Sequence, residues 1–228
     1  MPVLFFDIGA TLADVRVEAD GSLVLSPRPR VLAVLEELRE VRKGVISDPG
    51  PGEGAAERAA SALRKAFPGR FTDGALVHWG SKDGREIFDE AVAGTAEEGA
   101  PPSAADECVF VGEDPEERAF AGEAGLRTAA HPVFARASME NRPVFPARIE
   151  LSEGQELPAL EAVANRTEVV PVRIASARLV LAMASARGTT ALEQAGFTVD
   201  LREPVEGAAA FPVRGDHPLA PARGTAPG

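Results

Sequence analysis

Cysteine and long apolar runs are both scarce in this sequence. Cys108 is the single cysteine among 228 residues, which excludes an internal disulfide framework, fits a reducing compartment and favours a buried structural thiol. No apolar run approaches the roughly 18 residues that a membrane-spanning helix needs. The residues before Asp7 are too few, and lack the charge, for a signal peptide. We therefore expect a cytoplasmic protein that does not enter a membrane.

Positive charge is scarce as well. The chain has 24 Lys and Arg residues against 35 Asp and Glu, which gives a formal net charge of -11. Proteins that bind nucleic acid without sequence preference neutralise phosphates with Lys and Arg. No basic patch stands out in this sequence, so nucleic acid is not an expected partner.

Three common site motifs are missing too. There is no G-x-S-x-G nucleophile elbow. The glycine-rich segment 50–54 lacks the G-x-G-x-x-G spacing of dinucleotide-binding turns. His78, His131 and His217 are too scattered to show metal-ligand spacing.

What the sequence does contain, up to residue 130, is an alternation of short apolar runs with segments of helical periodicity. Strands are expected at residues 3–6, 44–46, 75–78, 108–111 and 126–130, and helices at 30–42, 53–67, 85–93 and 115–124. This alternation implies right-handed crossovers and a mostly parallel sheet, an α/β fold. Between Asp14 and Leu25, two alternating segments flank Asp20-Gly21, which predicts a small β-flap after the first strand.

Polar side chains follow several of these strands. Asp7, Ser47 and Glu113 each come at or just after a strand end, and a turn from Trp79 to Lys82 follows another. Because ligands of parallel sheets bind at the C-terminal ends of the strands, we expect these residues to share one site. The position of Trp79 is compatible with a side chain that lines this site and also with one that only packs within the fold.

The pattern changes near Pro146. We expect one domain over residues 1–148 and a small C-terminal α/β appendage over residues 149–205, with a role that the sequence leaves open. Residues 206–228 are rich in Ala, Pro and Gly and are expected to be a poorly ordered tail.

The loops after the first two strands resemble the first two motifs of the haloacid-dehalogenase (HAD) superfamily. Asp7 stands where the family has its aspartyl nucleophile, and Thr11 also matches. Gly9 departs from the pattern, because the phosphatases of the family usually carry a second Asp there as general acid and base. Ser47 matches the second motif, a hydroxyl that donates a hydrogen bond to the phosphoryl group.

The next two motifs follow in the family's order. Lys82, followed by Ile87-Phe88 at the usual spacing, matches the lysine that neutralises the nucleophile and the transferred phosphoryl group. An apolar strand then runs into Gly112-Glu113, with Glu117 four residues later, where the family usually has two Asp residues. The ordered set of four motifs implies a three-layer, Rossmann-like parallel sheet.

This resemblance implies a Mg²⁺-dependent phosphohydrolase that forms an aspartyl-phosphate on Asp7. A carboxylate that attacks a phosphoryl dianion needs Mg²⁺ and a lysine to offset the repulsion. The implied Mg²⁺ ligands are Asp7, the backbone carbonyl of Gly9 and Glu113, with Asp114 as an alternative.

The family also predicts the kind of substrate. Neither the interval from Asp7 to Ser47 nor that from Ser47 to Lys82 has room for an inserted cap domain. A capless member has an open site and tends to act on large phosphorylated substrates, or has its site covered by a partner subunit or an appended segment. An oligomer or a protein partner is therefore compatible with the sequence.

Gly9 is the residue that distinguishes between two possible functions. Loss of a general acid and base typically costs about 10² to 10⁴ in rate, so the phosphohydrolase should be slow unless Asp14, Asp48 or the substrate substitutes. The alternative is a catalytically impaired HAD-like binding or scaffolding protein; dehalogenation ranks third, because the dehalogenases carry a cap. Glycine could instead be required at position 9 by a positive φ angle.

Overall fold

The computed structural model describes residues 2–19 and 21–202, which form two compact units. The first unit ends at Pro143 and the second begins at Val144. Across these described residues, no helix combines the length and the apolar character needed to cross a membrane.

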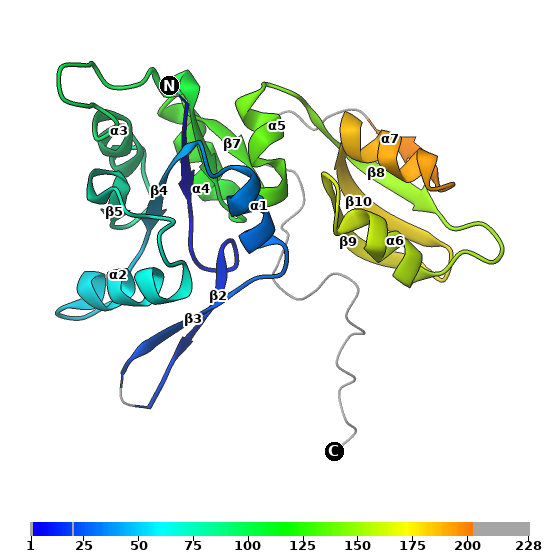
Figure 1. Ribbon diagram of the computed structural model, residues 1–228, viewed down its shortest axis with the longest axis horizontal. Helices are drawn as coiled ribbons and strands as arrows, with labels where there is room; N and C mark the ends of the chain where they lie inside the picture. Colours follow the sequence, from blue (N-terminus) through cyan, green and yellow to red (C-terminus); the bar gives the residue numbers. More distant parts are fainter. Residues whose placement is uncertain (1, 20, 203–228) are drawn as a thin grey trace. The chain divides into compact units, whose positions relative to one another are not determined.

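The first unit is built on a five-stranded parallel sheet (Figure 1). Its strands are β1 (Val3–Phe6), β4 (Arg42–Ser47), β5 (Val77–Trp79), β6 (Cys108–Val111) and β7 (Arg127–Ala129). They lie in the order β5-β4-β1-β6-β7, so β1 is central and pairs with β4 on one side and β6 on the other. The chain therefore winds outward in one direction from β1 and later returns to wind in the other, which creates a topological switch point beside β1.

Helices cover both faces of this sheet. They are α1 (Val31–Glu37), α2 (Ala55–Ala66), α3 (Glu86–Ala93), α4 (Pro115–Glu123) and α5 (Ala135–Met139), with short 3₁₀ turns η1 (Gly74–Leu76), η2 (Ala105–Glu107) and η3 (Pro132–Phe134). Val3 and Phe5 pack in one core with Phe88 of α3 and Ala121 of α4. Successive side chains of a strand point to opposite faces, and Phe6 contacts Phe71 on the other face. The predicted three-layer α/β class is confirmed.

The predicted flap follows β1. Its two strands, β2 (Ala13–Val17) and β3 (Leu23–Pro27), pair in antiparallel register with Val15 opposite Leu25 and Val17 opposite Leu23. In Figure 1 this hairpin projects away from the parallel sheet.

One predicted helix is shorter than its apolar pattern. The periodicity over residues 30–42 continues through Leu38 and Val41, but α1 ends at Glu37 and β4 begins at Arg42. The buried Lys43 ammonium donates to the carbonyls of Leu38 and Val41 and so holds a turn between the helix and the strand. Leu38 is buried within that turn, which explains why the sequence reads as continuous helix.

The second unit has a different architecture. It runs β8 (Val144–Glu150), α6 (Leu157–Ala164), β9 (Val169–Ser176), β10 (Leu179–Ser185), α7 (Ala186–Gln194) and β11 (Thr198–Leu201). The antiparallel order β11-β8-β10-β9 makes this a β-α-β-β-α-β unit, a split βαβ arrangement. It encloses a core of its own, which includes Ile149, Leu160, Val180 and Leu192.

The expected domain boundary after residue 148 falls inside β8. Pro146 suggests an end to regular structure, because proline lacks the N–H that a central strand needs. Here the Pro146 carbonyl accepts from the N–H of Arg202 at 2.9 Å, so its nitrogen faces the β11 side, where strand pairing stops at Leu201. The proline therefore costs no bond to β10, and the boundary is corrected to Pro143/Val144. The tail predicted at residues 206–228 lies outside the described residues.

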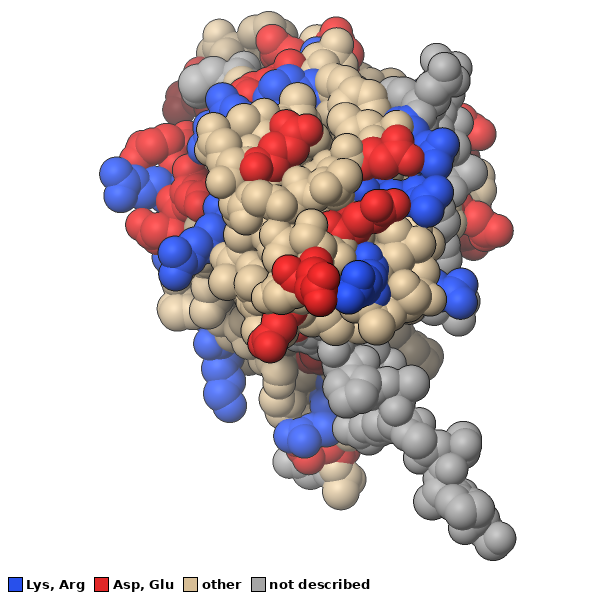
Figure 2. Space-filling model, turned by 90° about the vertical axis from the view of Figure 1, so that its right-hand side faces the viewer, with Lys and Arg blue, Asp and Glu red and all other residues tan. Residues whose placement is uncertain are grey.

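Charge is dispersed over the face of the molecule drawn in Figure 2. Lys and Arg side chains alternate there with Asp and Glu side chains and with uncharged surface, and the basic groups form no continuous patch on that face.

Candidate active site

Asp7 lies at the switch point of the parallel sheet. It directly follows β1, and its backbone N–H donates to the carbonyl of Val111 in β6 at 2.9 Å. Since β1 pairs with both β4 and β6, the residues that follow these three strands meet around Asp7. The Asp7 side chain is buried, with 6% of its surface exposed.

Two of the predicted partners contact the Asp7 carboxylate directly. The Ser47 hydroxyl, at the end of β4, donates to Asp7 Oδ1 at 3.0 Å. The Lys82 ammonium, from the turn after β5, forms an ion pair and a hydrogen bond with the same oxygen. All three side chains are buried, so the carboxylate is held by one charged and one neutral donor away from bulk water.

Lys82 also contacts a second acid. Its Nζ lies 2.8 Å from Oε2 of Glu117, in the first turn of α4. Burial alone would lower the pKa of Lys82, but the Asp7 and Glu117 carboxylates outweigh that effect and raise it. Burial raises the pKa of Glu117 to about 7, against the lowering influence of Lys82. Lys82 is therefore a firmly charged bridge between two carboxyl groups.

Thr11 contacts Glu113 across the switch point. Its hydroxyl donates to Glu113 Oε2 at 2.8 Å and accepts from the Glu113 N–H at 3.2 Å. These two bonds fix the direction of the Glu113 side chain, so Thr11 acts as a positioning residue. Burial and the nearby Asp7 carboxylate both raise the pKa of Glu113.

Asp114, the alternative metal ligand predicted from the sequence, makes a structural contact. Its side chain accepts from the backbone N–H groups of Glu116 at 2.7 Å and Glu117 at 3.3 Å, which makes it the N-cap of α4. Nearby, the buried Arg118 guanidinium donates to the Gly112 carbonyl at 2.6 Å and so fixes the same loop.

The backbone does not require glycine at position 9. Gly9 has no positive φ angle, and a Cβ built there would meet only Val15 Cγ2, at 3.9 Å. The left-handed residue of this loop is Ala10, with φ 52, and the Arg28 guanidinium donates to its carbonyl. The loop conformation therefore does not exclude a carboxylate side chain at this position.

The two acids considered as substitutes for a carboxylate at position 9 both have other partners. Asp14 pairs with Arg28 at 3.2 Å. Asp48 accepts from the N–H of Gly50 at 2.8 Å, in the turn after β4.

The charge balance of the site fits a bound cation. Asp7, Glu113 and Glu117 place three carboxyl groups around the single ammonium of Lys82. No group of three His, Cys, Asp or Glu side chains among the described residues is arranged to hold a metal by itself. Mg²⁺, however, is commonly held by one or two carboxylates and keeps several waters. Asp7 and Glu113, whose carboxylates repel each other, are the two residues that could hold such an ion.

A cavity of about 430 Å³ lies beside Asp7, because Ser47, which donates to Asp7, lines it. Ser47 and Gly9 form part of its wall, together with the flap, the loop after β4, α2 and Trp79. Trp79, for which the sequence allowed two roles, lines this cavity.

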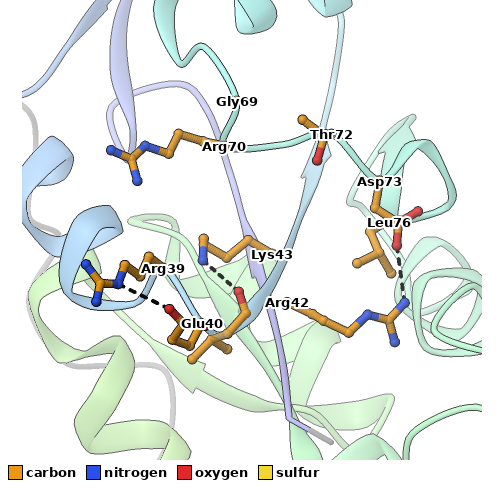
Figure 3. A pocket seen from close by; sticks show the side chains of 10 residues that line it. Arg39, Glu40, Arg42, Lys43, Gly69, Arg70, Thr72, Asp73 and Leu76 are labelled. Carbon is orange, nitrogen blue, oxygen red and sulfur yellow. Dashed lines mark hydrogen bonds and ion pairs between the residues drawn. The ribbon is translucent and has the colours of Figure 1, made fainter.

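A second cavity, of about 390 Å³, lies at the opposite edge of the sheet, where β4 begins with Arg42 and Lys43 (Figure 3). Its cations already have partners: Arg42 pairs with Asp73 at 3.2 Å, Arg70 with Glu36 at 2.6 Å and Arg39 with Glu40 at 3.2 Å. Lys43 donates to the Val41 carbonyl at 2.6 Å. These contacts give that cavity a structural explanation, and it is remote from Asp7 along β4.

The four residues predicted from strand ends therefore gather at one edge of the sheet. Ser47 and Lys82 contact Asp7, and Glu113 lies close enough for its pKa to respond to Asp7. The sequence motif alone does not place Glu117 in the site, although Glu117 contacts Lys82. Its position in the first turn of the helix that follows Glu113 is the signal that could have placed it there.

Comparisons with known proteins give little beyond this geometry. No protein-family model matches the chain, and no curated protein matches it. Among solved structures, the chain is similar to the cobalt-bound form of deoxy-D-mannose-octulosonate 8-phosphate phosphatase from Haemophilus influenzae. The two are 15% identical, with a TM-score of 0.38, and the match covers 56% of this chain and 67% of the other. A likeness this distant assigns no activity, so the site is interpreted from its own contacts.

Proposed function

We propose that this chain is a HAD-type phosphohydrolase that works, slowly, through an aspartyl-phosphate on Asp7. The observation that carries the proposal is the pairing of a buried Asp7 with both the Lys82 ammonium and the Ser47 hydroxyl at the switch point of the sheet. A nucleophilic carboxylate, a cation to offset the charge of the incoming phosphoryl group and a neutral donor to its oxygens are the groups that this chemistry needs.

In the first step, an Asp7 carboxylate oxygen forms a bond to phosphorus while the bond from phosphorus to the ester oxygen breaks. Lys82 reduces the repulsion between the carboxylate and the phosphoryl oxygens, and Ser47 donates to one of those oxygens. The leaving oxygen departs with the electron pair of the broken bond. It takes its proton from water, because Gly9 has no side chain to supply one.

In the second step, water attacks phosphorus and the acyl phosphate bond to Asp7 breaks. Inorganic phosphate is released, Asp7 returns as a carboxylate and the proton of the attacking water passes to phosphate or solvent. Asp7, Glu113 and the backbone carbonyl of Gly9 would hold Mg²⁺. When bound, the ion would neutralise charge on the phosphoryl group and stabilise the transition state.

Gly9 makes a second function worth testing, that of a catalytically impaired binding or scaffolding protein. The general acid and base is missing, and the two nearest candidate substitutes, Asp14 and Asp48, have partners elsewhere. General acid–base catalysis contributes about 10² to 10⁴ in rate. A slow phosphohydrolase and a catalytically impaired binding protein therefore differ only in rate. Detection of the aspartyl-phosphate intermediate distinguishes them.

The capless character of the proposed enzyme is supported by the segments between the motifs. Between Asp7 and Ser47 the described chain forms only the flap, α1 and β4, and between Ser47 and Lys82 it forms α2, η1 and β5. We propose a phosphorylated substrate that reaches an open site in the cytoplasm. Coverage of the site by a partner subunit or another protein is part of the same proposal.

The experiment is detection of the phosphorylated chain. We expect wild-type protein mixed with Mg²⁺ and an aryl phosphate to release a burst of phenol, and acid-quenched samples to show one added phosphoryl group by intact mass. Asp7→Asn should give neither signal, whereas Asp14→Asn, in strand β2 of the flap and outside the Asp7 cluster, should behave as wild type. A folded wild-type protein without burst, adduct or turnover on several phosphate esters would leave the binding protein as the better description.

A further inference from the structure

We infer that the cavity beside Asp7 receives an apolar, preferably aromatic, leaving group, so that the substrates are aryl or similarly apolar phosphate monoesters. This inference rests on the proposed phosphohydrolase function and names the substrate class of that site.

The flap supplies an apolar wall to this cavity. Val15 and Val17 lie on the same face of β2, because they are two residues apart. In the register of the hairpin they stand opposite Leu25 and Leu23, so two cross-strand apolar pairs share that face. All four residues line the cavity.

The outer part of this wall is exposed within the described part of the chain. Leu25 is buried, but Val15 is 47% exposed and Val17 is 67% exposed. Ala55 and Ala59 of α2 and Trp79 also line the cavity. An aromatic group bound in it would remove apolar surface from water.

The cavity is positioned to receive the leaving group and not some remote part of a substrate. Ser47 both donates to Asp7 Oδ1 and lines the cavity, so the cavity begins one hydrogen bond from the nucleophile. Gly9 adds no side chain on this side, and a Cβ there would stand 3.9 Å from Val15. The space next to the nucleophile is therefore continuous with the apolar wall.

Polar groups suited to a sugar or a nucleotide are few in this cavity. Asp48 and Arg58 are the charged residues that line it. Asp48 accepts from the Gly50 N–H, and Arg58 donates to the Glu53 carbonyl at 2.7 Å. A volume of about 430 Å³ suits a small molecule. Size and lining together favour an apolar ester over a polyol.

Binding of non-hydrolysable phosphonates tests the inference without requiring turnover. With Mg²⁺ present, we expect calorimetry to show benzylphosphonate binding roughly tenfold or more tightly than methylphosphonate, since the ring is buried only in the first. Val17→Asn should reduce that ratio several-fold and leave methylphosphonate binding unchanged. Val24→Asn, on the opposite face of the same hairpin, is the matched control and should keep the wild-type ratio.

Three results would overturn the inference. Equal affinity for the two phosphonates, with phosphate esters still hydrolysed, would remove the apolar subsite and leave the proposed function intact. Equal effects of Val17→Asn and Val24→Asn would show that the flap acts only through its stability. If neither phosphonate binds and no ester is hydrolysed, the proposed function fails and the substrate class fails with it.

Discussion

Asp7 illustrates what a buried carboxylate needs in order to remain charged. An isolated carboxylate loses several kcal/mol on leaving water unless it is paired and hydrogen-bonded, and Asp7 has both Lys82 and Ser47. The same two groups are those that phosphoryl transfer would use. In the proposed function, the contacts that stabilise the buried carboxylate would also prepare it for reaction.

Gly9 offers the sharpest test at the scale of one residue. We predict that Gly9→Asp raises the steady-state rate on an aryl phosphate by about 10-fold or more, because a carboxylate there can activate the water that hydrolyses the intermediate. The position has room for a side chain and no positive φ angle. Steady-state and burst kinetics measure the change, and the burst should shrink as the second step accelerates.

Gly9→Asn is the control for this gain, because it adds a similar side chain that cannot accept a proton as a carboxylate does. It should leave the rate near the wild-type value. A folded Gly9→Asp protein with no increase in rate would mean that the missing acid is not what limits turnover.

Glu117 gives a pH-dependent prediction. Its pKa is raised from 4.5 to about 7 in the folded protein. The folded state therefore binds this proton more tightly than the unfolded state, so the stabilising contribution is complete below pH 4.5 and is lost as pH rises through about 7. We expect this group to lower the free energy of unfolding by up to about 3 kcal/mol between pH 4.5 and 8.

The measurement is urea unfolding across that pH range without added Mg²⁺, comparing wild type with Glu117→Gln. The wild-type stability relative to the variant should fall with rising pH. Glu116→Gln, at an exposed neighbouring position, should follow the wild-type curve. A pH-independent difference between wild type and Glu117→Gln would contradict the raised pKa.

At the scale of an element, the loop from β6 into α4 separates two acids that are neighbours in the sequence. Glu113 turns toward Thr11 and the site, whereas Asp114 caps the helix. We predict that Asp114→Ala lowers the free energy of unfolding by about 1 kcal/mol and leaves Mg²⁺ affinity nearly unchanged. Glu113→Gln should do the reverse and weaken Mg²⁺ binding. Chemical denaturation and calorimetry measure the two effects.

Asp114→Asn provides the control for the cap, because asparagine also accepts from the helix N–H groups. Its stability should remain close to that of wild type. Loss of Mg²⁺ binding in both Asp114 variants would mean that Asp114 is a metal ligand.

The same loop shows how far the sequence could predict the site. Asp7, Ser47, Lys82 and Glu113 could be placed together because parallel strands bring their C-terminal ends to one edge. The contact between Thr11 and Glu113 joins residues 102 positions apart, and no local pattern specifies it. The cap of Asp114 is local, but the sequence could not decide which of two adjacent acids would turn inward.

At the scale of the molecule, the two units differ in how far their architecture could be predicted from the sequence. The parallel unit alternates buried strands with amphipathic helices, so its order could be predicted from periodicity, apart from the end of α1 that Lys43 determines. The second unit depends on antiparallel pairing between distant strands, which periodicity does not reveal. Pro146 concealed the start of β8, because its tolerance depends on where pairing with β11 stops.

The division at Pro143/Val144 leads to the last prediction. The described core of the first unit lies within its own sheet and helices, so we expect a fragment of residues 1–143 to fold. Cys108 reports on that core, because it is fully buried in β6 and burial raises its pKa to about 11. In the folded fragment at pH 8 the thiol should resist alkylation, since the reactive thiolate is both scarce and inaccessible.

The Cys108 thiol of the fragment should react fully in urea, with labelling and circular dichroism following one cooperative transition. The full chain is the control and should show the same protection. Rapid labelling of Cys108 in the fragment alone would mean that residues after 143 complete the first core, and the boundary would then be wrong.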